Sequence, residues 1–130
     1  MRFAVFTVSL PEWTPEEAVR NLAELGYGGV EWRIADDLPR ATPGFWQGNR
    51  CTFPLSSFVE DAPQIRALTE AAGLAIPAIA SYVQATDLEN AERVLHGAGP
   101  ECVPLVSPTP PRHAAPVPHS PDRRLGRSWQ

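Results

Sequence analysis

Two charged residues interrupt an otherwise apolar run, and they are the first candidates for chemistry. The run GGVEWRI places Glu31 and Arg33 in alternation with Val30, Trp32 and Ile34. Successive side chains of a β-strand point to opposite faces, so this strand has one apolar face and one face with a carboxylate and a guanidinium. A buried charge is costly without a partner or a purpose. The pattern therefore favours a ligand-binding role, with a structural ion pair across the sheet as the alternative.

Four further residues are candidates for contacting a ligand, because each follows or ends a strand-like run. Trp13 comes shortly after the apolar run 3–8, Trp46 lies in the segment after the second run, and Tyr82 and Gln84 end the third. Ligands of parallel α/β proteins gather at the carboxyl ends of the strands. We therefore expect these four side chains on the same rim as the two charged residues. Packing within the molecule is the alternative for each of them.

The remaining polar residues of the body do not add a catalytic group. Asp36 and Asp37 are compatible with carboxylates at a site mouth and equally with a solvated turn, so we assign neither to the site. His96 comes late in a predicted helix, where a cation suits the negative end of the helix dipole. We therefore name no catalytic residue.

The strands and helices that position the candidate residues are predicted to alternate along the chain. A strand is predicted over 3–8, buried on both faces because it is continuously apolar or β-branched. The next helix begins with Thr14 as N-cap and ends at Gly26. Since a strand follows after a short turn, we expect a right-handed crossover and a parallel sheet. The other predicted elements are a strand over 28–34, a helix over 58–73, a strand over 74–83, a helix over 87–96 and a strand over 102–106.

Apolar spacing predicts which sides of the helices pack on the sheet. In the first helix the stripe consists of Ala18, Val19, Leu22 and Leu25, and in the last helix of Leu88, Ala91 and Leu95. The strand over 102–106 is restricted to a sheet edge or an irregular strand, because Pro104 lacks a backbone donor. Residues 35–57 form a long excursion whose aromatic residues argue against simple disorder: Phe45, Trp46 and Phe53.

Composition divides the chain into a body and a tail. Residues 1–98 carry seven Arg against thirteen Asp or Glu, whereas residues 99–130 carry four Arg, two acidic residues and eight of the fifteen prolines. The tail has no helical or strand periodicity and few large apolar residues. We predict a single folded part over 1–98 and a disordered, Pro- and Arg-rich tail over 99–130.

The same composition excludes several classes of function. An acidic body without clustered cations argues against nucleic-acid binding. All eleven cations are Arg, so the chain has no lysine for Schiff-base chemistry. Cys51 and Cys102 lack the spacing of a metal site, and no run approaches the roughly 18 apolar residues of a membrane span. Without a secretion signal, we expect a cytoplasmic protein that binds a small molecule and neither nucleic acid nor membrane.

Three stretches together resemble a known family. The segments FAVFTVSL, TPEEAVRNLAELGYGGVEWRI and TEAAGLAIPAIASYV are similar to the start of the sugar phosphate isomerase/epimerase family, the xylose-isomerase-like TIM barrels, over about residues 1–98. The resemblance implies a (β/α)₈ barrel whose members act on sugars, inositols or hydroxy acids with a divalent metal. It places Glu31 near the substrate, where it and Arg33 would hold hydroxyl groups of a sugar or hydroxy acid.

The chain also departs from this family. A TIM barrel takes about 250 residues, whereas the pattern here supplies three βα units and the signal for a fourth strand. The metal ligands of the family lie on later strands, so we expect no metal site and no cofactor in this chain. We therefore predict a truncated family member that is inactive alone, and we interpret the composition change near residue 98 as a truncated gene copy or a reading-frame change.

One physical consequence separates this interpretation from its alternatives. An open parallel sheet leaves edges and an apolar face uncovered, so we expect self-association. The main alternative is a small, self-sufficient α/β binding module with the Pro-rich tail as an interaction arm. A metal-independent enzyme with Glu31 as general base is a further alternative.

Overall fold

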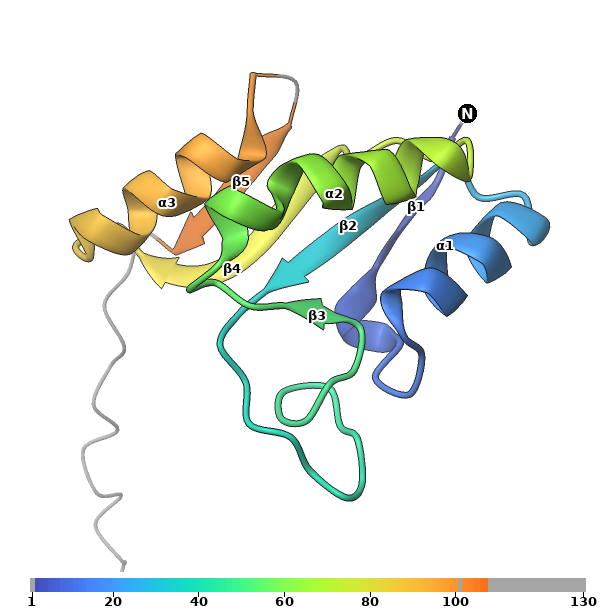
Figure 1. Cartoon of the computed structure of the whole chain (residues 1–130), viewed down its shortest axis with the longest axis horizontal. Coiled ribbons are helices and arrows are strands. Elements are labelled where there is room, and N and C mark those ends of the chain that lie inside the picture. The colour runs from blue at the N-terminus through green and yellow to red at the C-terminus, as the bar shows by residue number, and fades with distance from the viewer. Residues whose placement is uncertain (1, 101, 108–130) are drawn as a thin grey trace, which may run out of the picture.

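The computed structural model describes residues 2–100 and 102–107, so most of the predicted tail lies outside the described residues. Helices and strands alternate along most of the chain (Figure 1). The elements are β1 (Ala4–Phe6), a 3₁₀ turn (Thr7–Ser9), α1 (Pro15–Glu24), β2 (Gly29–Ile34), β3 (Thr52–Phe53), α2 (Phe58–Ala71), β4 (Ala78–Gln84), α3 (Leu88–Ala98) and β5 (Val103–Ser107). The predicted α/β class with a parallel sheet is confirmed in this part of the chain.

The strands form one open, parallel sheet in the order β1-β2-β4-β5. The short strand β3 pairs with the second half of β2, where Arg33 is opposite Thr52 on one side and Ala80 of β4 on the other. β1 pairs with the first half of β2 and β3 with the second half, so the two strands lie one after the other along the same side of β2. It lies within the excursion 35–57, for which the sequence predicted no strand.

Helices α1, α2 and α3 share one hydrophobic core with the apolar face of β2. Val30, Trp32 and Ile34 are fully buried, and Trp32 Nε1 donates to Thr69 Oγ1 of α2 at 3.1 Å. The opposite face of the sheet has no helix among the described residues. The predicted division of β2 into an apolar and a charged face is confirmed.

Local signals account for the first helix. Thr14 Oγ1 accepts from the backbone N–H of Glu17, and the Glu17 carboxylate accepts from the backbone N–H of Thr14, so both ends of a capping box are present. Pro15 occupies the first turn, and Gly26 follows the helix at φ +81°. The left-handed conformation of Gly26 is one that glycine adopts without strain.

Several predictions of burial were wrong. The first strand has only three residues and is not buried on both faces, because it lies at the edge of the sheet and Phe3 beside it is 61% exposed. Leu25 is exposed, since it is the C-cap residue and lies beyond the packed part of α1. In α3 the predicted Leu88 and Leu95 are exposed, and the buried side consists of Val94, Gly97 and Ala98.

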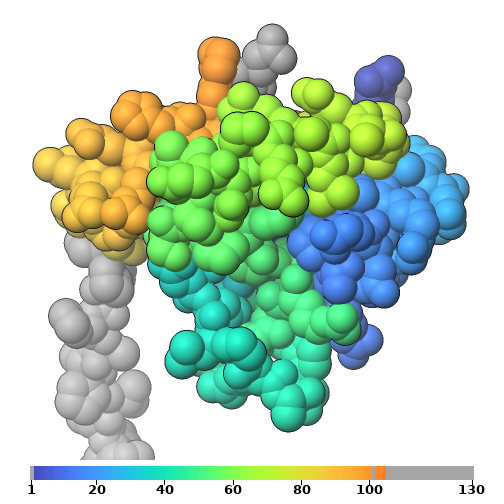
Figure 2. Space-filling model, in the orientation of Figure 1, coloured from blue at the N-terminus to red at the C-terminus, as the bar shows by residue number. Residues whose placement is uncertain are grey.

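Three further features describe the rest of the fold. The expected edge position of the last strand is confirmed, since among the described residues β5 pairs with β4 and with no other strand. In the space-filling view the excursion 35–57, coloured teal to green, forms a lobe beside the helical layer (Figure 2). Among the described residues, no helix has the length and apolar character to cross a membrane.

Candidate functional site

Arg33 lies at the centre of a polar cluster near the carboxyl end of β2. Its side chain is on the face opposite the helices and is almost fully buried. Nη1 donates to Asp37 Oδ2 at 3.2 Å and to Thr52 Oγ1 at 2.8 Å, and Nη2 donates to the carbonyl oxygen of Trp46 at 3.1 Å. All three acceptors belong to the excursion 35–57, so Arg33 fastens this segment to the sheet.

Two aromatic rings lie against this guanidinium. The Tyr82 ring centre is 5.6 Å from Arg33 Cζ, a cation–π contact, and Trp46 meets Tyr82 edge-on at 5.7 Å. Both rings are partly open to solvent, and Tyr82 has a positive φ of 55° next to an irregularity in β4. Burial raises the pKa of the Tyr82 hydroxyl, and Arg33 opposes part of this shift. The rings offer an apolar surface beside a charged donor.

Asp37 neutralises Arg33 and ties a second part of the excursion to it. Its Oδ2 also accepts from the backbone N–H of Asn49 at 3.3 Å. Burial alone would raise the pKa of Asp37, but hydrogen bonds from the backbones of Gly48 and Asn49, together with Arg33, lower it below its usual value. The carboxylate is therefore charged at neutral pH.

Glu31 is the second charged group on this face of β2. It is half-buried, and desolvation raises the pKa of its carboxyl. Within the described residues no salt bridge joins it to Arg33, whose only carboxylate partner there is Asp37. Glu31 is thus a partly buried carboxyl group that can accept hydrogen bonds from a ligand on the open face.

The side chain of Asn49 forms hydrogen bonds that hold parts of the excursion together. Its Nδ2 donates to the carbonyl oxygens of Val8 and Phe45 at 3.1 and 3.3 Å, and its Oδ1 accepts from the backbone N–H of Cys51 at 2.9 Å.

A concavity of about 300 Å³ lies beside this arrangement. Its polar lining comes from Asp36, Asp37, Arg40, Asn49, Arg50 and Thr52.

The structure brings only some of the predicted site residues together. Arg33, Trp46 and Tyr82 are in contact. Trp13 instead packs against the hydrophobic core, which matches its alternative interpretation as a packing residue. Gln84 ends β4 with a buried Oε1 that has no hydrogen-bond partner within the described part of the chain.

Sequence reasoning missed three residues of the cluster. Asp37 had a usable signal, because it follows Arg33 by four residues and opposite charges in the same neighbourhood pair readily. Thr52 and Asn49 had none, since they reach the cluster through the path of an irregular segment. This path cannot be derived from periodicity.

The arrangement can bind a polar ligand more readily than it can carry out covalent catalysis. It presents charged hydrogen-bonding groups beside aromatic rings, as small-molecule sites do. Burial raises the pKa of the Cys51 thiol to about 12, so this cysteine is not a reactive nucleophile. In comparisons with family models and with curated proteins, the chain matches none.

Proposed function

We propose that this chain is the amino-terminal part of a sugar phosphate isomerase/epimerase-like barrel and carries part of a pocket for a sugar or hydroxy acid. In this proposal the described sheet is the first part of a (β/α)₈ wall, and its helix-free face is the inner surface. The chain alone would bind such a ligand without converting it.

The topology supports this proposal. Neighbouring strands follow one another in chain order except for the short β3, all pairs are parallel, and the three helices pack on one face. A singly wound sheet of this kind is the arrangement from which (β/α)₈ barrels are built. The polar cluster also lies near the carboxyl ends of β2 and β4, where such barrels bind their ligands.

The observation that carries the proposal is the contact of Arg33 with Tyr82, next to Trp46 and Glu31. A sugar needs several hydrogen-bonding groups in fixed positions together with an apolar surface for its C–H faces. Arg33 is held rigidly by three hydrogen bonds, and its Nε has no acceptor within the described part of the chain. Because this Nε is buried, a ligand hydroxyl or carboxylate would satisfy it only after the side chains that cover it move.

The divalent metal of the family does not fit the described residues. Metal sites of this type use several carboxylate or imidazole ligands. No three His, Cys, Asp or Glu side chains gather in residues 2–100 and 102–107 as such ligands would. The proposal therefore includes no metal-dependent step in this part of the chain.

A ligand panel tests the proposal. Pentoses, hexoses, inositols and short hydroxy acids are added to the full chain, and binding is followed by saturation-transfer NMR and by tryptophan fluorescence. We expect millimolar binding of at least one compound, with quenching that Trp46→Phe abolishes. Trp13→Phe is the matched control and should leave the quenching in place. Absence of saturable binding by any member of the panel would refute a sugar or hydroxy acid pocket.

A second candidate is the self-sufficient binding module. It is favoured by one observation, namely that every hydrogen bond of the Arg33 side chain within the described residues goes to the excursion 35–57. In that case the hydrogen bonds of Arg33 hold the excursion against the sheet, and the excursion itself is the binding surface. Arg33→Lys would then lower the stability of the fold, and neither the original chain nor the variant would bind a sugar.

A further inference from the structure

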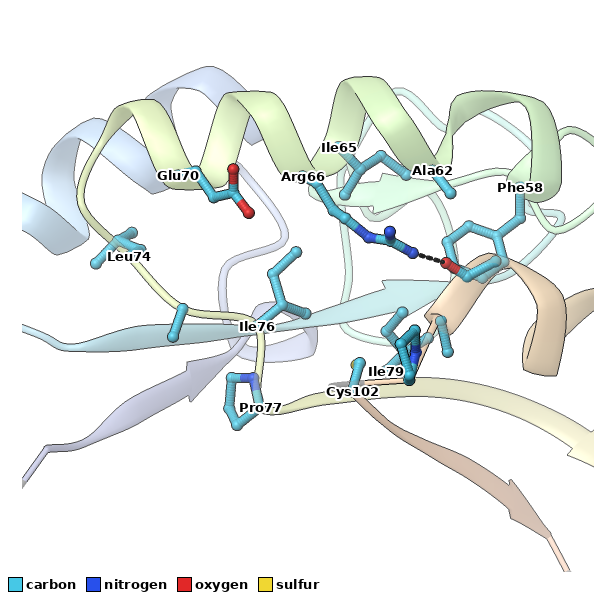
Figure 3. Close-up of a pocket in the computed structure, with 14 residues that line it drawn as sticks. Phe58, Ala62, Ile65, Arg66, Glu70, Leu74, Ile76, Pro77, Ile79 and Cys102 are labelled. Carbon is cyan, nitrogen blue, oxygen red and sulfur yellow. Dashed lines mark hydrogen bonds between the residues drawn. The ribbon is translucent and has the colours of Figure 1, made fainter.

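A second concavity lies on the other side of the sheet, between α2, the loop that follows it, β4 and α3 (Figure 3). Its volume is about 530 Å³, within the range of roughly 300–1,000 Å³ typical of small-molecule pockets. Most of its wall is apolar, and the main contributors are Phe58, Ile65, Leu74, Ile76, Ile79 and Cys102. The hollow is partly open to solvent, so a small molecule can enter it.

One cation lies on this wall within the described part of the chain. Arg66 of α2 reaches across the pocket, and its Nη2 donates to the carbonyl oxygen of Gly97 in α3 at 2.9 Å (Figure 3). A guanidinium has five N–H donors, and within the described residues the bond to Gly97 is the only hydrogen bond of the Arg66 side chain. Unlike Arg33 and Arg93, which pair with Asp37 and Glu89, Arg66 has no carboxylate partner among the described residues.

Glu70 limits the charge that a ligand can carry. It follows Arg66 by one helical turn and lines the same pocket, without forming an ion pair with it. A second negative group on the ligand would lie near this carboxylate and be repelled. Within the described residues the pocket thus combines an apolar wall with one guanidinium that forms no ion pair and one carboxylate.

We propose that this pocket binds an amphiphile with one carboxylate head and an unbranched alkyl chain. The carboxylate accepts hydrogen bonds from the free donors of Arg66, and the chain lies against Ile65, Ile76 and Ile79. This site is separate from the proposed sugar pocket, since it lies on the helical side of the sheet. It does not depend on that function.

Alkylation of Cys102 tests the site in the full chain. The sequence contains two cysteines, of which Cys51 is fully buried and Cys102 lines the pocket, so iodoacetamide should modify Cys102 first. Octanoate at saturation is expected to slow its alkylation at least fivefold, followed by mass spectrometry. The neutral 1-octanol should need about tenfold higher concentration for the same protection, because it lacks the charged hydrogen bonds to Arg66.

Two variants of the same helix separate the head group from the chain. Arg66→Gln should abolish the preference for octanoate over 1-octanol, whereas Glu70→Gln should keep or strengthen it. Continued protection of Cys51 checks that each variant is folded. The proposal is overturned if octanoate does not protect Cys102, if both compounds protect the original chain equally, or if the folded Arg66→Gln variant keeps the preference.

Discussion

Burial of Arg33 is compensated by an almost complete set of partners. Removing a guanidinium from water costs several kcal/mol, and this cost is offset only when a counter-charge and good hydrogen bonds are present. Arg33 has the Asp37 carboxylate, the Thr52 hydroxyl, the Trp46 carbonyl and the Tyr82 ring. The same contacts help to hold the excursion 35–57 on the sheet, so the Arg33–Asp37 ion pair contributes to the stability of this segment.

Replacing Asp37 by Asn should destabilise the fold in a pH-dependent manner. We expect a loss of about 1–3 kcal/mol at neutral pH, because charge-assisted hydrogen bonds to Arg33 and Asn49 are weakened. The pKa of Asp37 is lower in the folded chain than its ordinary value of 3.8. Its stabilisation is therefore complete above that value and is lost as the pH falls through the folded pKa. Urea unfolding at several pH values should show a difference from the original chain that narrows below about pH 4.

Asp36→Asn is the control for this prediction. Asp36 is exposed and accepts from the backbone N–H and hydroxyl of Ser56. Its replacement should cost less than about 1 kcal/mol. Equal losses for both variants would show that the Arg33 ion pair has no special role.

Helices α1 and α3 show what apolar patterns can and cannot predict. The start of α1 was predictable, because Thr14 and Pro15 act through local geometry. The buried side of α3 was not, since the pattern favoured the large residues Leu88 and Leu95 over Gly97. The helix uses small residues to approach Phe58 closely, and this choice depends on a partner distant in sequence.

The site was predictable to a similar extent. Alternation along β2 correctly separated Glu31 and Arg33 from the apolar face. The contact of Trp46 with Tyr82 joins two segments far apart in sequence, and only their shared position after strands suggested it. The role of Asn49 depends on the folded path of the excursion, which no local signal describes.

Gly97→Ala should destabilise the chain, although alanine is the better helix former. Propensity alone would favour Ala by up to about 1 kcal/mol. A methyl group at Gly97 would collide with the ring of Phe58, however, and overpacking of this kind typically costs about 1–3 kcal/mol. Thermal unfolding should show a lower midpoint for Gly97→Ala.

Combining Gly97→Ala with Phe58→Leu tests the cause of this change. The smaller side chain removes the collision, so the double variant should lose less stability than the two single losses added together. Strictly additive losses would exclude the contact as the cause.

The whole molecule is an open sheet with helices on one face. The other face is partly covered by the excursion 35–57 around Arg33, but apolar side chains remain exposed at both edges, including Phe3 at 61% and Val103 at 59%. Arg33 pairs with Ala80 of β4, and Val103 pairs with Ala78 of β4. Because Ala78 and Ala80 are two residues apart on one strand, the side chains of Val103 and Arg33 lie on the same face of the sheet. An exposed parallel edge beside apolar side chains is a surface on which other chains associate.

Self-association should therefore depend on this face of β5. We expect sedimentation velocity of the full chain to show species heavier than the 14.2 kDa monomer. Val103→Lys should shift the distribution towards the monomer, because charged side chains at sheet edges oppose pairing between molecules. Leu88→Lys is the matched control, since Leu88 is similarly exposed, at 71%, but lies on α3. A monomeric original chain, or an equal effect of both lysines, would show that the open face does not drive association.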